Sequence, residues 1–171
     1  MRLTPHFTMG ELVASDTALR MGIDNTPQAQ SVTDNLFLLA EVLELIREAL
    51  GAPVICASGY RCEDLERVLT GKDFAAWCER HQIQPDKLGW RTYFKRKAHP
   101  QGRAADFTAP QFGTPAQIVK AIAARPDIMA KIDQIIMEGG WVHVAIGDNP
   151  RGEVLTAIFT DGAPRYSKGV E

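Results

Sequence analysis

Hydrophobic positions between residues 32 and 50 recur at steps of three and four, which is the spacing of a helix that buries one face. Gly51 follows as a C-terminal stop, and Pro53 excludes continuation of the helix. We therefore predict a helix over residues 32–50. Its buried face should carry Leu36, Leu39, Leu43, Ile46 and Leu50.

Shorter patterns predict the other elements. Thr114, Pro115 and Gln117 form a helix start, with a hydroxyl N-cap, a proline at the first helical position and a glutamine three residues after the cap. Apolar runs between turn residues predict strands, and glycine-containing turns should join the last three. A polar loop is expected up to Gln30. The expected helices cover residues 9–14, 62–69, 74–81 and 114–124, and the expected strands cover residues 53–57 (buried), 104–108, 132–137, 141–146 and 154–159.

Length and composition are those of one soluble domain. The 171 residues, 45% hydrophobic and 23% charged, can bury a sizeable core. Helices packed against a small, mostly antiparallel sheet make an α+β domain. The formal net charge of -2 indicates no general affinity for nucleic acid or anionic lipid. No signal-peptide pattern and no membrane-spanning apolar run is found, so we expect a soluble protein.

The three cysteines do not form a recognisable site. Cys56, Cys62 and Cys78 are odd in number and lack CxxC spacing, which excludes a disulfide framework and a cysteine zinc site. We expect buried or free thiols in a reducing compartment, and keep a Cys56–Cys62 pair as the alternative.

Three residues have the chemistry of a zinc site. His99 precedes Asp106 by seven residues, and Gly102 between them permits the tight approach that turns both side chains toward one point. His143 lies in a separate predicted strand. Imidazole and carboxylate are good zinc ligands, and three protein ligands leave a fourth position open, as in catalytic sites. The spacing alone also fits polar core or surface residues. His6 and His81 have no partner at ligand spacing, and we expect neither to take part.

Three strings together resemble one enzyme family. They are Ser-Gly-Tyr-Arg at residues 58–61, His-Pro-Gln-Gly-Arg-Ala-Ala-Asp at 99–106 and Trp-Val-His at 141–143. Their order is similar to that of the M15 metallopeptidases, which include D-alanyl-D-alanine carboxypeptidases, L-alanyl-D-glutamate endolysins and the hedgehog-like zinc fold. Residues 7–12 and 22–25 resemble the small phage- and prophage-associated branch. The resemblance implies a single zinc peptidase domain over residues 1–171, with an insertion at 71–97.

The resemblance also implies roles for the site residues. His99, Asp106 and His143 would bind Zn²⁺. The family's general base is a carboxylate shortly before the last histidine, often three residues before it, where this chain has Gly140. Glu138 is the nearest carboxylate. It can reach the site if Gly139 and Gly140 form a bulge or tight turn; otherwise it is a solvated residue beside a hairpin.

Arg61 corresponds to the arginine of the family's SxxR motif. Its guanidinium would hold the scissile carbonyl and stabilise the oxyanion, and the alternative is a structural salt bridge from a helix start. Ser58 would contact substrate or cap the following turn. Tyr60 and Trp141 are also expected to bind substrate.

Two further residues are expected to be structural. Asp133 should be a partner at the start of a strand, and Arg103 should fix the loop between the ligands.

The predicted insertion is rich in aromatic and basic residues. Trp90, Tyr93 and Phe94 interleave with the basic residues 95–97. This composition fits single-stranded nucleic acid, a wall of a substrate cleft, or an extension that buries its own aromatics. Because the segment ends just before His99, we expect it near the rim of the site.

The resemblance implies a zinc-dependent hydrolase that cuts the peptidoglycan stem peptide, as a carboxypeptidase or an endolysin. The alternative is a catalytically impaired, zinc-containing cell-wall-binding or phage structural module. We expect a monomer that binds neither membrane nor nucleic acid. It would be made in the bacterial cytoplasm, either to be released to the cell wall as a phage or prophage product or to act in recycling.

Overall fold

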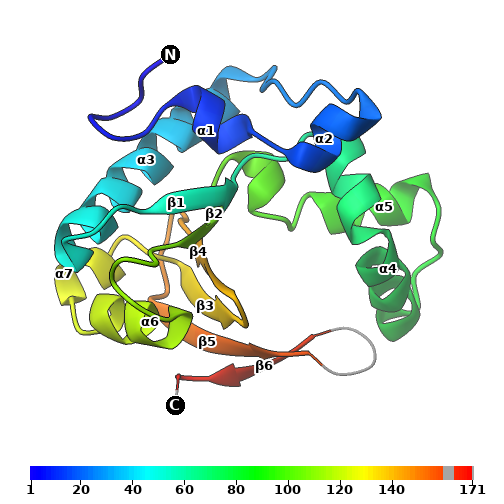
Figure 1. Ribbon diagram of the computed structural model, residues 1–171. Coiled ribbons are helices and arrows are strands. Elements are labelled where there is room, and N and C mark those ends of the chain that lie inside the picture. The colour runs from blue at the N-terminus through cyan, green and yellow to red at the C-terminus, as the bar shows by residue number, and fades with distance from the viewer. Residues whose placement is uncertain (160–163, 171) are drawn as a thin grey trace.

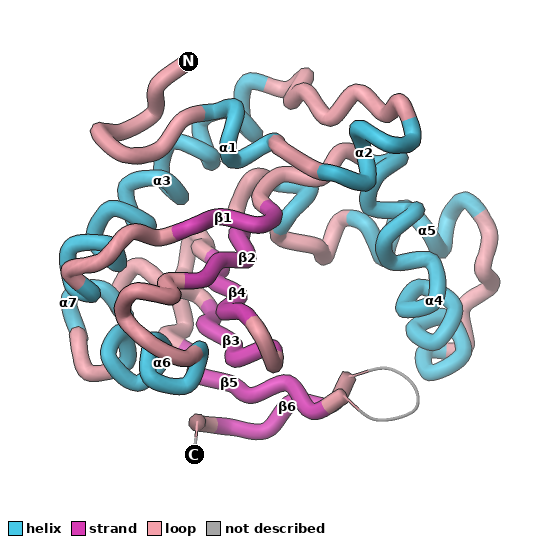
Figure 2. The backbone as a smooth tube through the Cα atoms, viewed as in Figure 1, coloured by secondary structure: helices cyan, strands magenta, loops and turns pink. Residues whose placement is uncertain are grey.

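A computed structural model describes residues 1–159 and 164–170, and a six-stranded open sheet organises the fold (Figure 1). The strand order is β1-β2-β4-β3-β5-β6, as Figure 2 shows from top to bottom. Neighbouring strands are antiparallel except β3 and β5, which run parallel. The α+β prediction is confirmed. The strands are β1 (Ile55–Ser58), β2 (Ala104–Thr108), β3 (Gln134–Glu138), β4 (Trp141–Ala145), β5 (Glu153–Ile158) and β6 (Arg165–Lys168).

Most of the helices form two groups on opposite sides of the sheet. In Figure 1, α3, α6 and α7 lie on the left, and α4 and α5 lie on the right. Helices α1 and α2 follow the upper edge, where α1 contacts β1. The helices are α1 (Met9–Val13), α2 (Asp16–Met21), α3 (Gln30–Leu50), α4 (Glu63–His81), α5 (Lys87–Phe94), α6 (Pro115–Ala123) and α7 (Pro126–Met129), with a short 3-10 helix η1 (His99–Gln101).

The main core lies between α3, α6 and one face of the sheet. All five residues predicted for the buried face of the long helix are buried, and Gly51 ends α3 in a left-handed conformation. Thr114 and Gln117 form the expected capping box on α6. Strands β2 and β4 contribute Phe107, Val142 and Val144 to this core. Because side chains alternate along a strand, Asp106 and His143 face the other side of the sheet.

Several elements differ from the predictions. The helices expected at 62–69 and 74–81 are one continuous helix, α4, because a single glycine at Gly71 costs only about 1 kcal/mol and does not end it. Helix α2 interrupts the expected polar loop and is capped by Ser15. Strand β1 is not buried, since it lies at the sheet edge and Ile55 is 54% exposed. Helices α5 and α7, the short helix η1 and strand β6 were not predicted.

Within the part of the chain that the structure describes, no helix combines the length and the hydropathy needed to cross a membrane.

Candidate metal centre

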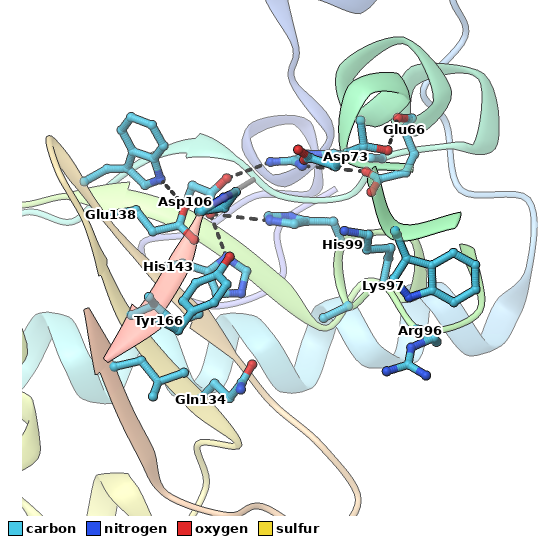
Figure 3. A pocket seen from close by; sticks show the side chains of 18 of the residues that line it. Glu66, Asp73, Arg96, Lys97, His99, Asp106, Gln134, Glu138, His143 and Tyr166 are labelled. Carbon is cyan, nitrogen blue, oxygen red and sulfur yellow. Dashed lines mark hydrogen bonds and ion pairs between the residues drawn. The ribbon is translucent and has the colours of Figure 1, made fainter. Parts of the chain in front are cut away.

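The structure brings His99, Asp106 and His143 together on the side of the sheet opposite the main core. One ligand atom from each residue can be chosen so that all three atoms lie within 4.8 Å of one another. Asp106 on β2 and His143 on β4 are direct partners in the antiparallel register, and η1 delivers His99 from the chain just before β2. Figure 3 shows the three side chains converging. No other group of this kind occurs among the described residues.

A backbone hydrogen bond fixes the orientation of His99. Its Nδ1 lies 2.6 Å from the carbonyl oxygen of Gly59. Because a carbonyl only accepts, Nδ1 must carry the proton, which leaves Nε2 free as a ligand and turned toward Asp106 Oδ1 at 3.4 Å. Gly59 itself cannot be replaced easily, since a Cβ there would overlap the Leu12 carbonyl oxygen.

The pKa values of His99 and Asp106 favour the protonation states that metal binding requires. Burial lowers the pKa of His99 to about 4, so the ring is neutral at neutral pH. Burial alone would raise the pKa of Asp106, but electrostatic and hydrogen-bond interactions with His99 and His143 outweigh it and hold that pKa far below its usual range. Two imidazoles and one carboxylate are the donor set of a catalytic zinc site with an open position. The residues present therefore fit a zinc ion.

Glu138 faces the same side of the sheet as the cluster, and the tight turn that a catalytic role for it requires is present. Gly139, with φ +63°, and Gly140 form a two-residue turn that pairs Glu138 with Trp141. Ile136 pairs with His143, and Glu138 lies two residues further along β3, so it faces the same side. Its Oε2 accepts a hydrogen bond from Trp141 Nε1 at 3.0 Å, and burial raises its pKa.

Arg61 is held by three oxygen-bearing side chains. Its Nη2 donates to Asp106 Oδ2 at 2.7 Å and its Nε donates to Ser58 Oγ at 3.0 Å. Its Nη1 lies 3.6 Å from Glu66 Oε2. The salt bridge considered as an alternative therefore exists, yet the guanidinium also lines the cavity described below. The two interpretations of Arg61 are compatible.

The expected substrate contacts separate into two kinds. Trp141 is 39% exposed and lines the cavity. Ser58 is engaged with Arg61 rather than capping a turn. Tyr60 is buried in the main core and is not among the residues that line the cavity. Tyr60 therefore contributes packing, and its backbone N–H fastens the loop by donating to the Leu12 carbonyl at 2.7 Å.

The cluster opens into a cavity of about 540 Å³ between the sheet and helices α4 and α5. On the sheet side it is lined by the metal-site residues with Trp141, Phe159 and Tyr166. Helix α4 lines the other side with residues at helical spacing. These are Glu66, Thr70, Asp73 and Trp77, and Tyr93, Arg96 and Lys97 continue the wall beyond them.

Sequence reasoning missed Glu66 and Asn25. Glu66 is 1% exposed, and burial raises its pKa against the opposing effect of Arg61 and Lys97. Its spacing from Thr70 and Asp73 could have indicated a polar stripe on one helix face. Asn25 binds the backbone of Val13, Tyr60 and Cys62 at once, with distances of 2.7 to 2.9 Å. It thereby positions the loop that carries Arg61.

Other expectations concern residues away from the cluster. His6 pairs with Glu44, and His81 is bonded to the Trp77 carbonyl, so neither joins the cluster. Asp133 pairs with Arg151, as its structural role requires. All three cysteines are free, which confirms the thiol prediction over the Cys56–Cys62 pair.

Arg103 and the aromatic residues of the predicted insertion also have defined partners. Arg103 forms a double hydrogen bond with Asp148. Trp90 is 1% exposed and Tyr93 is 3% exposed, which leaves neither ring available for stacking on a nucleic-acid base. Phe74, Trp90 and Tyr93 pack on one another, with ring centroids 5.1 to 5.6 Å apart.

Comparison with known families gives a match to part of the chain. Residues 5–79, less than half of the chain, match the family model described as Peptidase M15. The matched stretch contains Asn25 and the loop from Ser58 to Arg61, and it ends before His99. No curated protein and no solved structure matches the chain.

Proposed function

Since the chain carries a Peptidase M15 family domain over residues 5–79, we propose that it is a zinc-dependent peptidase that hydrolyses the peptidoglycan stem peptide. The observation that carries this proposal is the His-Asp-His cluster, which lies in a cavity that Glu138 and Arg61 also line. The cavity volume is within the range of small-ligand sites and is large enough for a few peptide residues.

Zinc would be held by His99 Nε2, Asp106 Oδ1 and His143 Nδ1, the three atoms that face one another. When bound, zinc supplies an acidified water molecule and polarises the scissile carbonyl. Arg61 donates a hydrogen bond to Asp106 Oδ2, and the Gly59 carbonyl accepts one from His99 Nδ1. Each of these two ligands is therefore oriented through an atom that does not face the metal position.

Glu138 moves the protons. A general base has to be ionised near working pH and still basic enough to accept a proton, and the pKa of Glu138 is raised in that direction by burial. It takes a proton from the attacking water and passes it to the nitrogen of the leaving amine. The hydrogen bond from Trp141 keeps the carboxylate directed into the cavity.

Arg61 stabilises negative charge on the scissile oxygen. Two of its nitrogens are occupied by Ser58 and Asp106, which fixes the plane of the guanidinium. Its Nη1 has only the more distant Glu66 carboxylate at 3.6 Å, so this nitrogen can donate to the developing oxyanion.

The substrate class rests on the three motifs and on the M15 domain rather than on a bound ligand. Stem-peptide cleavage of the carboxypeptidase or endolysin type is the activity that these motifs support best. In this proposal the protein is a phage or prophage product that reaches the cell wall after synthesis in the cytoplasm.

The test is the metal content of the purified protein, measured together with amine release from purified peptidoglycan with and without a chelator. One zinc per chain and chelator-sensitive release are expected, and sequencing the fragments identifies the bond. Zinc binding without amine release would contradict the peptidase proposal and favour a cell-wall-binding module. A chain that binds no zinc even after reconstitution would remove the proposal.

A further inference from the structure

The wall of the cavity that faces the metal cluster has two halves of opposite charge. Helix α4 contributes the carboxylates Glu66 and Asp73, and the segment that follows α5 contributes Arg96 and Lys97. Figure 3 shows these four side chains across the cavity from His143 and Tyr166. Glu66 lies beside Arg61, so its charge is already balanced in part.

The basic half of the wall contains cations that form no close ion pair, although the charge of Lys97 acts on Glu66. No ion pair joins Arg96 or Lys97 to any residue in the described ranges, although ten other close charge pairs are present. Lys97 is partly buried, and its Nζ lies over the Tyr93 ring, 4.3 Å from the centroid. This cation–π contact keeps the ammonium group against the wall.

Tyr93 adds an unsatisfied polar atom at the same place. The residue is 3% exposed and lines the cavity, and its hydroxyl has no hydrogen-bond partner. A buried hydroxyl without a partner costs free energy, which a ligand could recover by providing an acceptor. Because this hydroxyl oxygen is itself buried, the side chains around it have to shift for a ligand to reach it.

The donors of this half match one kind of ligand. A lysine ammonium and an arginine guanidinium only donate, and the free tyrosine hydroxyl can donate as well. A group that accepts from all three and carries negative charge is an anion, and the anionic group of a peptide substrate is a carboxylate. The carboxylates on α4 would repel it, which confines it to the end of the wall formed after α5.

We infer that Lys97, Arg96 and Tyr93 form a subsite that binds a free carboxylate of the substrate, opposite the metal cluster. The inference rests on the proposed peptidase function and adds what the enzyme selects. The carboxylate can belong to the C-terminal residue, as in a carboxypeptidase substrate, or to a residue inside the stem peptide, as in an endopeptidase substrate.

Calorimetric binding of two peptide pairs to zinc-loaded Glu138→Gln protein tests the subsite without turnover. One pair is N-acetyl-D-alanyl-D-alanine and its C-terminal amide. The other is N-acetyl-L-alanyl-γ-D-glutamyl-L-lysinamide, whose one carboxylate is internal, and the same peptide with that carboxylate amidated. In at least one pair the acid should bind about tenfold more tightly than its amide. The pair that shows the preference identifies the source of the carboxylate.

Variants connect the preference to the wall. Lys97→Gln should remove most of it, Lys97→Arg should restore it, and Tyr93→Phe should reduce it by about threefold. Lys95→Gln is the matched control, because Lys95 lies on the same basic stretch but does not line the cavity. No preference in either pair, or a preference that persists after Lys97→Gln combined with Arg96→Gln, would overturn the inference.

Amine release by the wild-type protein from the same peptides tests the proposed function separately. A preference for the acid over the amide without amine release supports the carboxylate subsite and contradicts the proposed hydrolysis. Amine release without a preference for the acid supports the proposed hydrolysis and contradicts the subsite.

Discussion

Asp106 and His143 lie directly opposite each other on β2 and β4, with Asp106 Oδ1 2.8 Å from His143 Nδ1. Their distance is therefore set by the spacing of two paired strands rather than by a loop. The other oxygen of Asp106 is occupied by Arg61. Two of the three candidate ligands thus lie on neighbouring interior strands of the sheet, as a preorganised site requires.

Replacing His143 by alanine should remove stoichiometric zinc and reduce peptide hydrolysis to background, because two ligands hold the metal much less tightly than three. Elemental analysis after dialysis measures the first effect and amine release measures the second. His6→Ala is the matched control, since His6 pairs with Glu44 far from the cluster and its loss should change neither quantity. A His143 variant that keeps one zinc per chain would refute the ligand assignment.

Glu138→Gln should retain zinc and lower kcat by about 100-fold or more, which is the usual contribution of a general base. The side chain keeps its size and its position next to Trp141, so the fold and the metal content should be unchanged. Turnover close to that of the wild type would exclude Glu138 from proton transfer.

The pH profile of kcat/KM should show an acid limb set by Glu138. Burial raises the pKa of Glu138, so the base becomes protonated, and activity is lost, at a higher pH than for an exposed glutamate. The hydrogen bond from Trp141 opposes that shift. Trp141→Phe should therefore move the acid limb to still higher pH. An unchanged limb would mean that another group titrates there.

Gly59→Ala should destabilise the fold by about 2 kcal/mol or more, because the new Cβ would overlap the Leu12 carbonyl oxygen. The same change would disturb the carbonyl that holds His99, so zinc affinity should fall as well. Gly71→Ala is the control: it lies within α4 with nothing within 4 Å of a built Cβ, and it should stabilise by about 0.5–1 kcal/mol. Urea unfolding of the two variants measures whether each substitution lowers or raises the free energy of unfolding.

Asp133→Asn should cost about 1 kcal/mol at pH 7, because Arg151 makes two short hydrogen bonds to this carboxylate but is itself partly exposed. The hydrogen bonds from Arg151 lower the pKa of Asp133 in the folded state. The stabilisation is thus present above the unfolded pKa of about 4 and is lost as the pH falls through the lower folded value.

The difference in unfolding free energy between wild type and Asp133→Asn should accordingly shrink from pH 7 to pH 3. In an Arg151→Gln background the same substitution should show little pH dependence. A difference that stays constant across this range would show that the ion pair does not stabilise the fold.

The sequence predicts the elements that have strong hydrophobic periodicity or clear capping and stop residues. Helix α3 ends where Gly51 predicts, α6 begins at its capping box, and β2 has the predicted limits. The three candidate ligands could be named because few residue types bind zinc and their strings resemble a known family. Glu138 could be proposed because the resemblance implies a base shortly before the last histidine, and Gly139 and Gly140 permit the turn that this base requires.

The rest depends on contacts that local patterns do not encode. Helix α4 passes through Gly71 because Phe74 and Trp77 pack on α5, and no local pattern at 71 records that packing. The burial of Tyr60 could not be predicted, because a motif places a residue in the sequence and does not say which way its side chain points. Glu66 was missed because its burial depends on where α4 stands relative to the sheet.

The aromatic packing between α4 and α5 has a consequence for how this protein can diverge. Trp90 and Tyr93 are buried largely against residues of the same two helices, and the candidate ligands come from η1 and the sheet. Substitutions that reshape one lining of the cavity need not alter the other. The helical side of the cavity can therefore diverge or be engineered while the candidate metal site is inherited unchanged.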